Sequence, residues 1–337
     1  MKFNLHEDHK LLFGLAFSGY LILSLLIAVM PALWVQDNNK PLPASKPMTK
    51  LQREGLHVFI NNGCQYCHTQ QVRPIKMDAN LGRPSAPGDY ARLHRRNIWQ
   101  QTPAVLGSER TGPDLSNIGK RQPSATWQYM HLYNPRSVNK KSIMPSFSWM
   151  FKVEKNPPKN ATVVPIPKGY GPKNGSVVPT HRAKALVAYL LSLKQAPVNN
   201  QGATSQNAAS DTSMANAAKK KLNGASIYAN KCASCHQSDG KGVPGAFPPL
   251  AGSPAVSSNN PTEHIRIVLY GLHGKKIQGE DYSSVMPAWG KQLSDQQVAA
   301  VINYERTSWG NDAPAVTAAK VKKVRQDTSL GKIQSDK

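Results

Sequence analysis

Hydrophobic positions along the chain fall into three zones, and polar or proline-rich segments separate them. The first zone is an almost unbroken apolar run over residues 11–34, LLFGLAFSGYLILSLLIAVMPALW. A helix rises 1.5 Å per residue, so a helix of this length would cross the roughly 30 Å hydrocarbon core of a bilayer. The run exceeds the apolar core of a secretory signal peptide, and no small-residue cleavage site follows it. The pattern therefore predicts an uncleaved transmembrane anchor over residues 1–35.

Residues at the two ends of this run indicate its orientation. Lys2 and Lys10 favour a cytoplasmic N-terminus, and Trp34 lies where interfacial aromatic residues are found. Everything after Trp34 would then lie on the outer side of the membrane. Residues 36–50 are polar and proline-rich, which predicts an irregular stalk.

The second zone, residues 51–195, begins and ends with helical periodicity. Residues 51–64 (LQREGLHVFINNGC) and 181–194 (HRAKALVAYLLSLK) each place apolar side chains on one helical face. These positions are Leu56, Phe59 and Ile60 in the first segment, and Leu186, Tyr189, Leu190 and Leu193 in the second. The pattern predicts a domain opened and closed by amphipathic helices.

The third zone, residues 219–312, follows an Ala/Asn/Ser/Gln-rich segment at 196–218 that predicts a flexible linker. Helices are expected at 224–232 and 262–270, and a closing helix from Ser294, which forms a capping-box pattern with Gln297. The basic, polar residues 313–337 are expected to be a mobile tail. The fold class predicted is mainly α, with one membrane helix followed by two helical domains.

Each helical domain carries the sequence Cys-x-x-Cys-His, at Cys64–His68 and at Cys232–His236. This is the attachment signature of c-type haem, in which two thiols bond to the porphyrin and the histidine, here His68 or His236, becomes an iron ligand. The four cysteines of the chain, Cys64, Cys67, Cys232 and Cys235, are all used by the two motifs. The alternatives are a four-sulfur zinc site and redox-active dithiols. The repeated histidine and the wide separation of the pairs favour two covalently bound haem c groups.

The charge of the chain is strongly positive and is concentrated in the second zone. The net charge is +23, and residues 51–195 hold 21 Lys and Arg against 6 Asp and Glu. These basic residues are dispersed and accompany no nucleic-acid-binding signature, so we expect no nucleic-acid partner. Anionic lipid, an acidic protein surface, haem propionates or an acidic medium would account for the charge.

A methionine followed by proline occurs after each haem motif, at Met144 and Met286. A single methionine is more often a core residue than a ligand. The repeated context, Ser-Ile-Met-Pro and Ser-Val-Met-Pro, favours Met144 and Met286 as distal iron ligands, with Met150 as the alternative in the first domain.

This organisation resembles class I cytochromes c, in which a helix ending at the haem motif pairs with a closing helix. The segment Gly112-Pro113-Asp114-Leu115 looks like the cytochrome c segment whose proline carbonyl accepts a hydrogen bond from the proximal imidazole and whose leucine packs on the ring. Pro248 and Leu250 correspond to Pro113 and Leu115 in the second domain.

Residues 1–195 also resemble a more specific family. The strings Gly63-Cys-x-x-Cys-His-Thr-Gln-x-Val-Arg-Pro74, Arg110-Thr-Gly-Pro-Asp-Leu115, His131-Leu-x-Asn-Pro-Arg-Ser-Val138 and Ser142-Ile-Met-Pro145 occur in the order found in the mono-haem subunit of cbb3-type cytochrome c oxidase, the CcoO/FixO family. The resemblance implies that Arg73, Arg110 and Arg136 contact haem propionates or a neighbouring subunit; solvated arginine is the alternative. The resemblance also includes His131, which we expect to be a buried, hydrogen-bonded structural histidine.

The chain differs from that family in two places. Residues 152–180 form a Pro/Lys/Gly-rich insertion, expected to be an ordered surface loop or a partner contact. The chain also continues past residue 195 into the second haem domain. That domain is similar to the small cytochrome c modules fused to many respiratory enzymes, a generic likeness that indicates fold and ligands only.

The resemblance implies a membrane-anchored di-haem electron-transfer subunit of a terminal oxidase, held in the bacterial inner membrane with its haem domains in the periplasm. It would take electrons from a cytochrome c or cupredoxin and deliver them to a catalytic haem b/copper subunit, with a further cytochrome c subunit as another partner. Histidine and methionine would fill both axial positions of each iron, so no dioxygen-reducing or other catalytic residue is expected in this chain. The alternatives are a free membrane-bound di-haem shuttle, the cytochrome subunit of a nitric oxide reductase, and a haem-based gas sensor.

Overall fold

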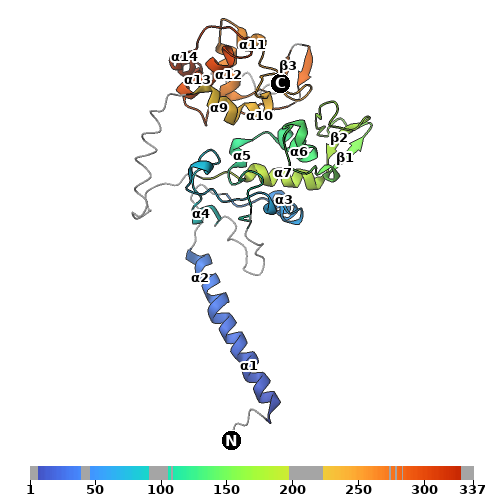
Figure 1. Cartoon of the computed structure of the whole chain (residues 1–337), viewed down its shortest axis with the longest axis vertical. Helices are drawn as coiled ribbons and strands as arrows, with labels where there is room; N and C mark the ends of the chain where they lie inside the picture. The colour runs from blue at the N-terminus through green and yellow to red at the C-terminus, as the bar shows by residue number, and fades with distance from the viewer. Residues whose placement is uncertain are drawn as a thin grey trace.

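The computed structural model describes residues 7–38, 46–90, 105–107, 109–196, 223–272, 275–277, 279–282 and 284–327. We call the described residues 46–196 the first domain and residues 223–327 the second domain. An isolated helix leads up to the first domain, and the second domain lies on the far side of the first (Figure 1).

The apolar run forms a continuous rod composed of α1 (His9–Ser24), a π-helical turn η1 (Leu25–Val29) and α2 (Met30–Asn38). Asp8 caps α1 by accepting a hydrogen bond from the Leu11 amide, 3.1 Å away. The stretch His9–Trp34 spans 26 residues with a mean hydropathy of 2.3, and none of it packs against the rest of the chain. It is long and apolar enough to cross a membrane. The rod extends three residues into the expected stalk, whose residues 39–45 lie outside the described part of the chain.

The first domain is built on the crossing of α3 (Lys50–Asn61) and α7 (His181–Ser192). A capping box between Thr49 and Gln52 fixes the start of α3. A Cβ atom on Gly55 would lie 1.9 Å from the Ala185 carbonyl oxygen, so only glycine permits this close approach of the two helices. The apolar faces expected from the sequence are buried there, except that Ile60 is half-buried.

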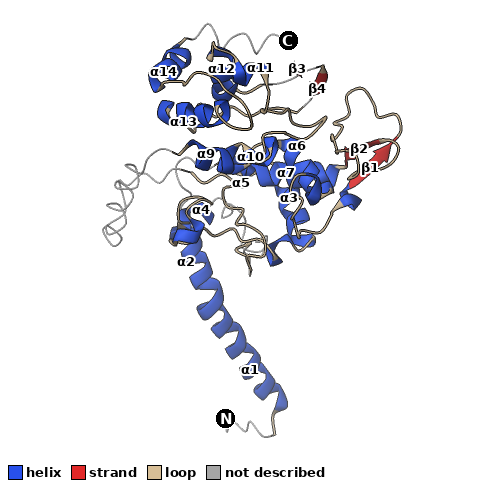
Figure 2. Ribbon diagram, turned by 45° about the horizontal axis from the view of Figure 1, so that its top comes forward, coloured by secondary structure: helices blue, strands red, loops and turns tan. Residues whose placement is uncertain are grey.

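Shorter elements connect these two helices. They are η2 (Cys64–Tyr66), η3 (Lys76–Asp78), α4 (Pro87–Tyr90), α5 (Ile118–Arg121), α6 (Ala125–Tyr133), η6 (Pro135–Ser137) and η7 (Ser148–Met150). The insertion at 152–180 is ordered, as expected, but it also contributes to a sheet that the sequence pattern did not predict. Strands β1 (Phe151–Glu154) and β2 (Ser176–Pro179) pair antiparallel, with Phe151 opposite Pro179 (Figure 2). Buried Val164 and Val177 join the insertion to the domain core.

The second domain repeats the helix crossing with α9 (Gly224–Lys231) and α13 (Asp295–Arg306). A Cβ on Gly224 would lie 2.0 Å from the Ala300 carbonyl oxygen, which matches the contact of Gly55 in the first domain. The predicted capping box of Ser294 and Gln297 is confirmed. The remaining elements are α10 (Ala233–His236), α11 (Pro254–Ser257), α12 (Thr262–Tyr270), and the antiparallel strands β3 (Lys275–Ile277) and β4 (Glu280–Tyr282).

The expectation of a mobile tail from residue 313 is wrong for its first half. Residues Ala318–Gln326 form helix α14, capped by Thr317. Val316, Val321 and Val324 are buried in one cluster with α12 and α13. The basic residues dominate the composition, but the valines supply an apolar face that packs on the domain. Residues 328–337 lie outside the described part.

The two domains are in contact. Val243, Ala246 and Phe247 of the second domain belong to the same buried cluster as the core of the first domain. Both ribbon views place α9 and α10 beside α5 and α6. Of the linker expected at 196–218, only Ala196 is described; its carbonyl accepts hydrogen bonds from the Arg83 guanidinium.

Candidate cofactor sites

Each motif histidine is fixed by a hydrogen bond to a proline carbonyl. His68 Nδ1 donates to the Pro113 oxygen at 2.8 Å, and His236 Nδ1 donates to the Pro248 oxygen at 2.9 Å. Burial lowers the pKa of both imidazoles below its ordinary value, so both rings are neutral at pH 7. With Nδ1 engaged as a donor, Nε2 is the ring nitrogen that remains for a metal.

The loop that carries Pro113 lies directly against the first motif. The Gly112 amide donates to the Cys67 carbonyl at 2.9 Å, and the Leu115 amide donates to the Thr69 carbonyl at 2.8 Å. A Cβ on Gly112 would lie 2.2 Å from the His68 ring, so a side chain there would displace the imidazole. Asp114 holds the other side of this loop through hydrogen bonds from Thr69 Oγ1 and the Gln71 and Ser116 amides.

The four thiols are free, and three of them are shielded. Burial raises the pKa of Cys64 and of Cys235 to about 12, and it raises that of Cys232 well above its ordinary value. Redox-active dithiols need the opposite shift, because the thiolate is the reactive form. No group of three or more His, Cys, Asp or Glu suited to a metal occurs among the described residues, which gives the four-sulfur zinc interpretation no support.

A cavity opens beside the second motif. The space inside it, including the part open to solvent, is about 1130 Å³. Its lining includes both predicted iron ligands, His236 and Met286, and most of the other lining residues are apolar. These others include Cys232, Cys235, Pro248, Leu250, Val268 and Trp289. Attachment thiols, imidazole, methionine and apolar walls therefore meet at one site.

The two candidate methionines of the first domain differ in their surroundings. Met150 is 1 % exposed and packs within the core, and its carbonyl accepts hydrogen bonds from the Thr180 amide and hydroxyl. Met144 is half-buried at the margin of the same cluster. Protein encloses the Met150 side chain, so an iron could not approach its sulfur. The packing therefore favours Met144 as the iron ligand.

Several buried polar atoms next to these sites have no partner within the described residues. They are Arg121 Nε and His131 Nδ1 in the first domain, and His264 Nδ1 and Ser284 Oγ, whose residues line the cavity, in the second. Native structures rarely leave such atoms unsatisfied. Anionic haem propionates would be suitable partners for the donors among them, Arg121 Nε and Ser284 Oγ, so the residues present fit a c-type haem. The sequence had not marked Arg121 as a site residue, although it lies shortly after the oxidase-like string Arg110–Leu115.

His131 differs from the hydrogen-bonded residue expected from the sequence. Its ring is half-buried and stacks on Trp127, with 4.5 Å between ring centroids and 12° between planes. Burial, with a smaller effect of His68, lowers the pKa of His131 to about 4. The imidazole is therefore neutral over the physiological pH range.

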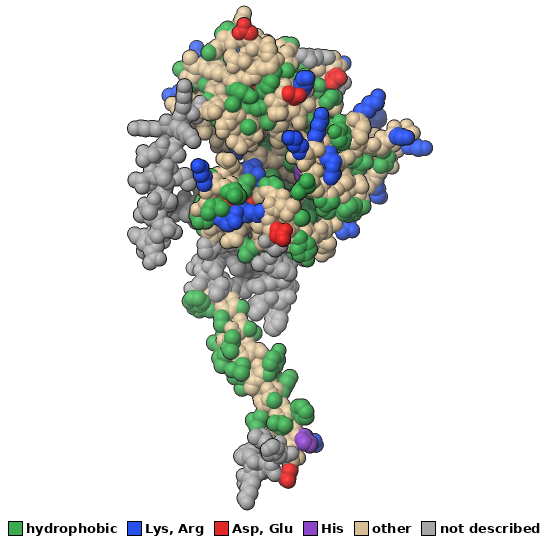
Figure 3. All heavy atoms as spheres, viewed as in Figure 1, with side chains coloured by type: hydrophobic (Ala, Val, Ile, Leu, Met, Phe, Trp, Pro, Cys, Tyr) green, Lys and Arg blue, Asp and Glu red, His purple; other side chains and the backbone are tan. Residues whose placement is uncertain are grey.

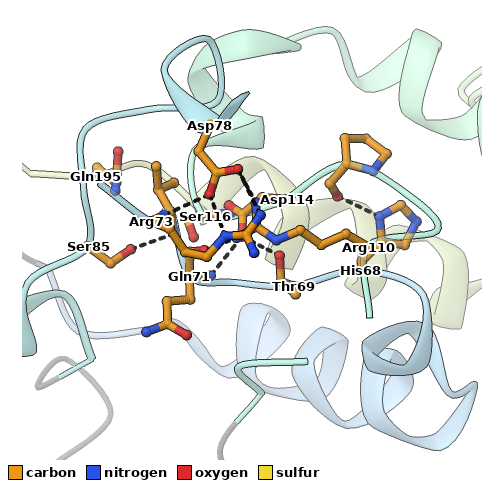
Figure 4. Close-up of polar contacts among 12 residues, drawn as sticks. His68, Thr69, Gln71, Arg73, Asp78, Ser85, Arg110, Asp114, Ser116 and Gln195 are labelled. Carbon is orange, nitrogen blue, oxygen red and sulfur yellow. Dashed lines mark hydrogen bonds and ion pairs between the residues drawn. The ribbon is translucent and has the colours of Figure 1, made fainter. Parts of the chain in front are cut away.

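The structure gives Arg73 and Arg110 a partner that the sequence did not indicate. Both guanidinium groups hydrogen bond to Asp78, whose side chain is fully buried (Figure 4). Removal from water acts to raise the pKa of Asp78, but the hydrogen bonds from Arg73 and Arg110 outweigh it, and the pKa falls to about 2. These arginines thus stabilise the loop after the first motif, and an additional propionate contact stays a prediction. Arg136 is exposed.

Comparison with known proteins adds a family likeness to this geometry. The family described as cytochrome C oxidase, mono-heme subunit/FixO matches residues 4–166, and the cytochrome c family matches residues 222–309. Cytochrome c-552 of Thermus thermophilus is 46% identical over 112 residues, which cover 30% of this chain and 83% of that protein.

Larger relatives match over a smaller part of their length. The cytochrome c subunit of the quinone alcohol dehydrogenase of Gluconacetobacter polyoxogenes is 40% identical over 142 residues, 42% of this chain. The cytochrome c subunit of gluconate 2-dehydrogenase of Pantoea cypripedii is 43% identical over 109 residues, 32% of this chain. The chain spans 30% of the first of these proteins and 25% of the second.

We predict that Asp78→Asn destabilises the first domain and removes part of its acid sensitivity. At pH 7 the two arginines would lose their buried carboxylate, which should lower the free energy of unfolding by about 3 kcal/mol. Because the native pKa is depressed, Asp78 stabilises the fold above pH 4, and this contribution is lost as the pH falls from about 4 to about 2. Urea unfolding of the detergent-solubilised protein, followed by circular dichroism at several pH values, measures both effects.

The matched control is Glu109→Gln, which removes one negative charge from an exposed position of the same domain. Equal stability of the two variants at pH 7 would contradict a structural role for the Asp78 ion pairs.

Proposed function

Since the chain belongs to the cytochrome c oxidase mono-haem subunit (FixO) family over residues 4–166 and carries a class I cytochrome c domain at 222–309, we propose that it is a di-haem electron relay of a cbb3-type haem–copper oxidase. Covalently bound haem c, electron transfer and membrane association follow from these families. The number of haems, the oxidase and the route of the electrons are our proposal. The single observation that supports it best is the pair of Cys-x-x-Cys-His motifs, each with a histidine hydrogen bonded to a proline carbonyl.

We assign one haem to each motif. Cys64 and Cys67 would attach the first haem, with His68 and Met144 as iron ligands. Cys232 and Cys235 would attach the second, with His236 and Met286 as ligands. When bound, each haem supplies a one-electron redox centre, and methionine ligation raises its reduction potential.

The protein residues would fix the histidine ligands and would keep dioxygen and water away from the iron. The hydrogen bonds to Pro113 and Pro248 hold each imidazole in one tautomer and orientation. With a histidine and a methionine bound to each iron, dioxygen would have no place to bind, so we assign oxygen reduction to the catalytic haem b/copper subunit. Apolar walls around His236 limit access of water to the second site.

The order of transfer is inferred from the position of the membrane helix. In a single-pass arrangement in the bacterial inner membrane with periplasmic domains, the first domain follows the anchor directly. Electrons would enter at the second domain from a cytochrome c or cupredoxin, pass to the first domain and leave for the catalytic subunit. The second domain would take over the role of some or all of a separate cytochrome c subunit.

A second candidate function is supported by the relatives that are cytochrome c subunits of alcohol and gluconate dehydrogenases. In that case the chain would receive electrons from a membrane dehydrogenase. A free shuttle or a nitric oxide reductase subunit remains the alternative implied by the sequence.

The oxidase assignment predicts which proteins remain bound to the tagged chain after gentle detergent extraction. Haem b, copper and cyanide-sensitive oxygen uptake should co-purify, and reduced-minus-oxidised spectra should show two c-type haems per copy of this chain. Co-purification of a dehydrogenase, or of c-type haem alone, would refute the oxidase assignment. A tagged, unrelated single-span membrane protein extracted in parallel controls for nonspecific association.

The ligand assignment predicts the response to carbon monoxide. The reduced wild-type c-type spectrum should not change, because both axial positions are filled. Met144→Leu should open one position and let carbon monoxide bind at one of the two haems. Met150→Leu is the matched control, since replacement of this core methionine should cost less than about 1.5 kcal/mol of stability and leave the spectrum unchanged. The opposite pattern would identify Met150 as the ligand.

The order of transfer is tested by Met286→Leu. Loss of this ligand should lower the potential of the second haem and slow reduction of the complex by a soluble donor protein by about tenfold or more. Turnover with a small chemical reductant, which can reach the first haem directly, should fall much less. Met77→Leu, at a position 78 % exposed, is the control. Equal losses with both reductants would refute the proposed order.

A further inference from the structure

The contact between the domains is centred on the second haem motif. Ser234 lies between the two attachment cysteines, Cys232 and Cys235. Its hydroxyl accepts a hydrogen bond from Gln122 Nε2 at 2.7 Å, and its carbonyl accepts one from Trp127 Nε1 at 2.9 Å. Two side chains of the first domain thus hold helix α10, the segment that would carry the second haem.

Gln122 is itself fixed and reaches the second site. Gln122 is buried and lines the cavity beside His236. Its main-chain carbonyl accepts a hydrogen bond from Gln128 Nε2 at 3.0 Å. The cavity of the second domain therefore has one wall residue from the first domain. This places the edge of the second site at the domain boundary.

Trp127 connects this boundary to the interior of the first domain. Its indole donates to Ser234, and its ring stacks nearly parallel on His131. His131 and Trp127 are on the same side of α6, four residues apart, so the stacked pair belongs to one helix of the first domain. A series of contacts thus runs from the second motif through Trp127 to His131 on α6 of the first domain.

The surrounding contacts are apolar and well packed. Val243, Ala246 and Phe247 are at most 5 % exposed and share a cluster with the first-domain core, and Cys235 packs against that cluster. Gln237 Nε2 adds a longer contact with the Val138 carbonyl at 3.5 Å. Burial of this kind indicates a defined docked arrangement of the domains, rather than the independent second domain that a flexible linker alone would give.

We propose that Trp127 is a positioning residue for electron transfer between the two haem sites, docking the second motif through Ser234 and extending the contact through His131. The proposal rests on the di-haem relay proposed above. In the transfer, the reduced second site loses one electron and the oxidised first site gains it. No covalent bond is made or broken and no proton moves.

The test compares Trp127→Phe with Trp149→Phe in the full-length protein with both haems attached. Phenylalanine keeps a ring to stack on His131 but lacks the N–H that binds Ser234. Trp149 is the matched control because it is 62 % exposed in the same domain. Electron redistribution between the haems after rapid one-electron photoreduction is the kinetic readout. Hydrogen exchange of the amides of residues 232–236 is the structural readout, independent of electron transfer.

We expect Trp127→Phe to slow electron redistribution about 2- to 10-fold, the effect on docking of one lost hydrogen bond. Exchange of the 232–236 amides should accelerate, and Trp149→Phe should change neither quantity. Gln122→Leu, which removes the other donor to Ser234, should act in the same direction, so the conclusion does not depend on one variant.

Wild-type values of both readouts in Trp127→Phe would overturn the proposal. Faster exchange with an unchanged electron-transfer rate would also overturn it, because Trp127 would then have a purely structural role. These outcomes are independent of the oxidase assignment: the measurement needs only this chain, whereas the oxidase assignment depends on the proteins that co-purify.

Discussion

The hydrogen bond between a motif histidine and a proline carbonyl is the constraint on which both sites depend. It fixes the imidazole only if the proline loop is itself rigid, and the two domains achieve this differently. In the first, the buried carboxylate of Asp114 accepts hydrogen bonds from both the motif side and the loop side. Main-chain hydrogen bonds support the loop in both domains; in the second they run from the Gly242 amide to the His236 carbonyl and from the Leu250 amide to the Gly240 carbonyl, and the Asn311 side chain adds a hydrogen bond to the Leu250 carbonyl. The same histidine–proline contact is thus supported by different side chains, Asp114 in one domain and Asn311 in the other.

Each haem motif is also positioned by a helix crossing that allows no side chain at its centre. Gly55 and Gly224 bring the helix before the motif into contact with the backbone of the closing helix. Burial of apolar side chains along these crossings provides the stabilisation, and the short approach distance sets where the motif begins. The domains therefore share one plan, while the sheet at β1–β2 and the helix α14 are additions to one domain each.

Local patterns in the sequence predicted the parts of the structure that depend on neighbouring residues. Helix faces, the capping box of Ser294 and the partners of the motif histidines all follow from short motifs. The burial of Asp78 between two arginines could not be predicted, because the loop that joins it to Arg110 has no periodic pattern. Helix α14 was not predicted because the many basic residues in this segment suggested a solvated tail. The helical spacing of Val321 and Val324 could have indicated its apolar face. The domain contact depends on residues more than a hundred positions apart, and no local signal encodes it.

The chemistry of the domain contact determines how the association of the two domains responds to ionic strength. The hydrogen bonds that reach Ser234 come from the neutral groups of Gln122 and Trp127. The charges nearby are alike: Lys231 of the second domain is within electrostatic range of Arg121 and Lys120 of the first, and its pKa is lowered by burial and by their charge. Basic side chains are also exposed on the face of the molecule that Figure 3 shows. Added salt screens the repulsion between the domains and equally screens the attraction of an acidic partner. A rise in salt that weakened the binding of such a partner would therefore favour the association of the two domains with each other.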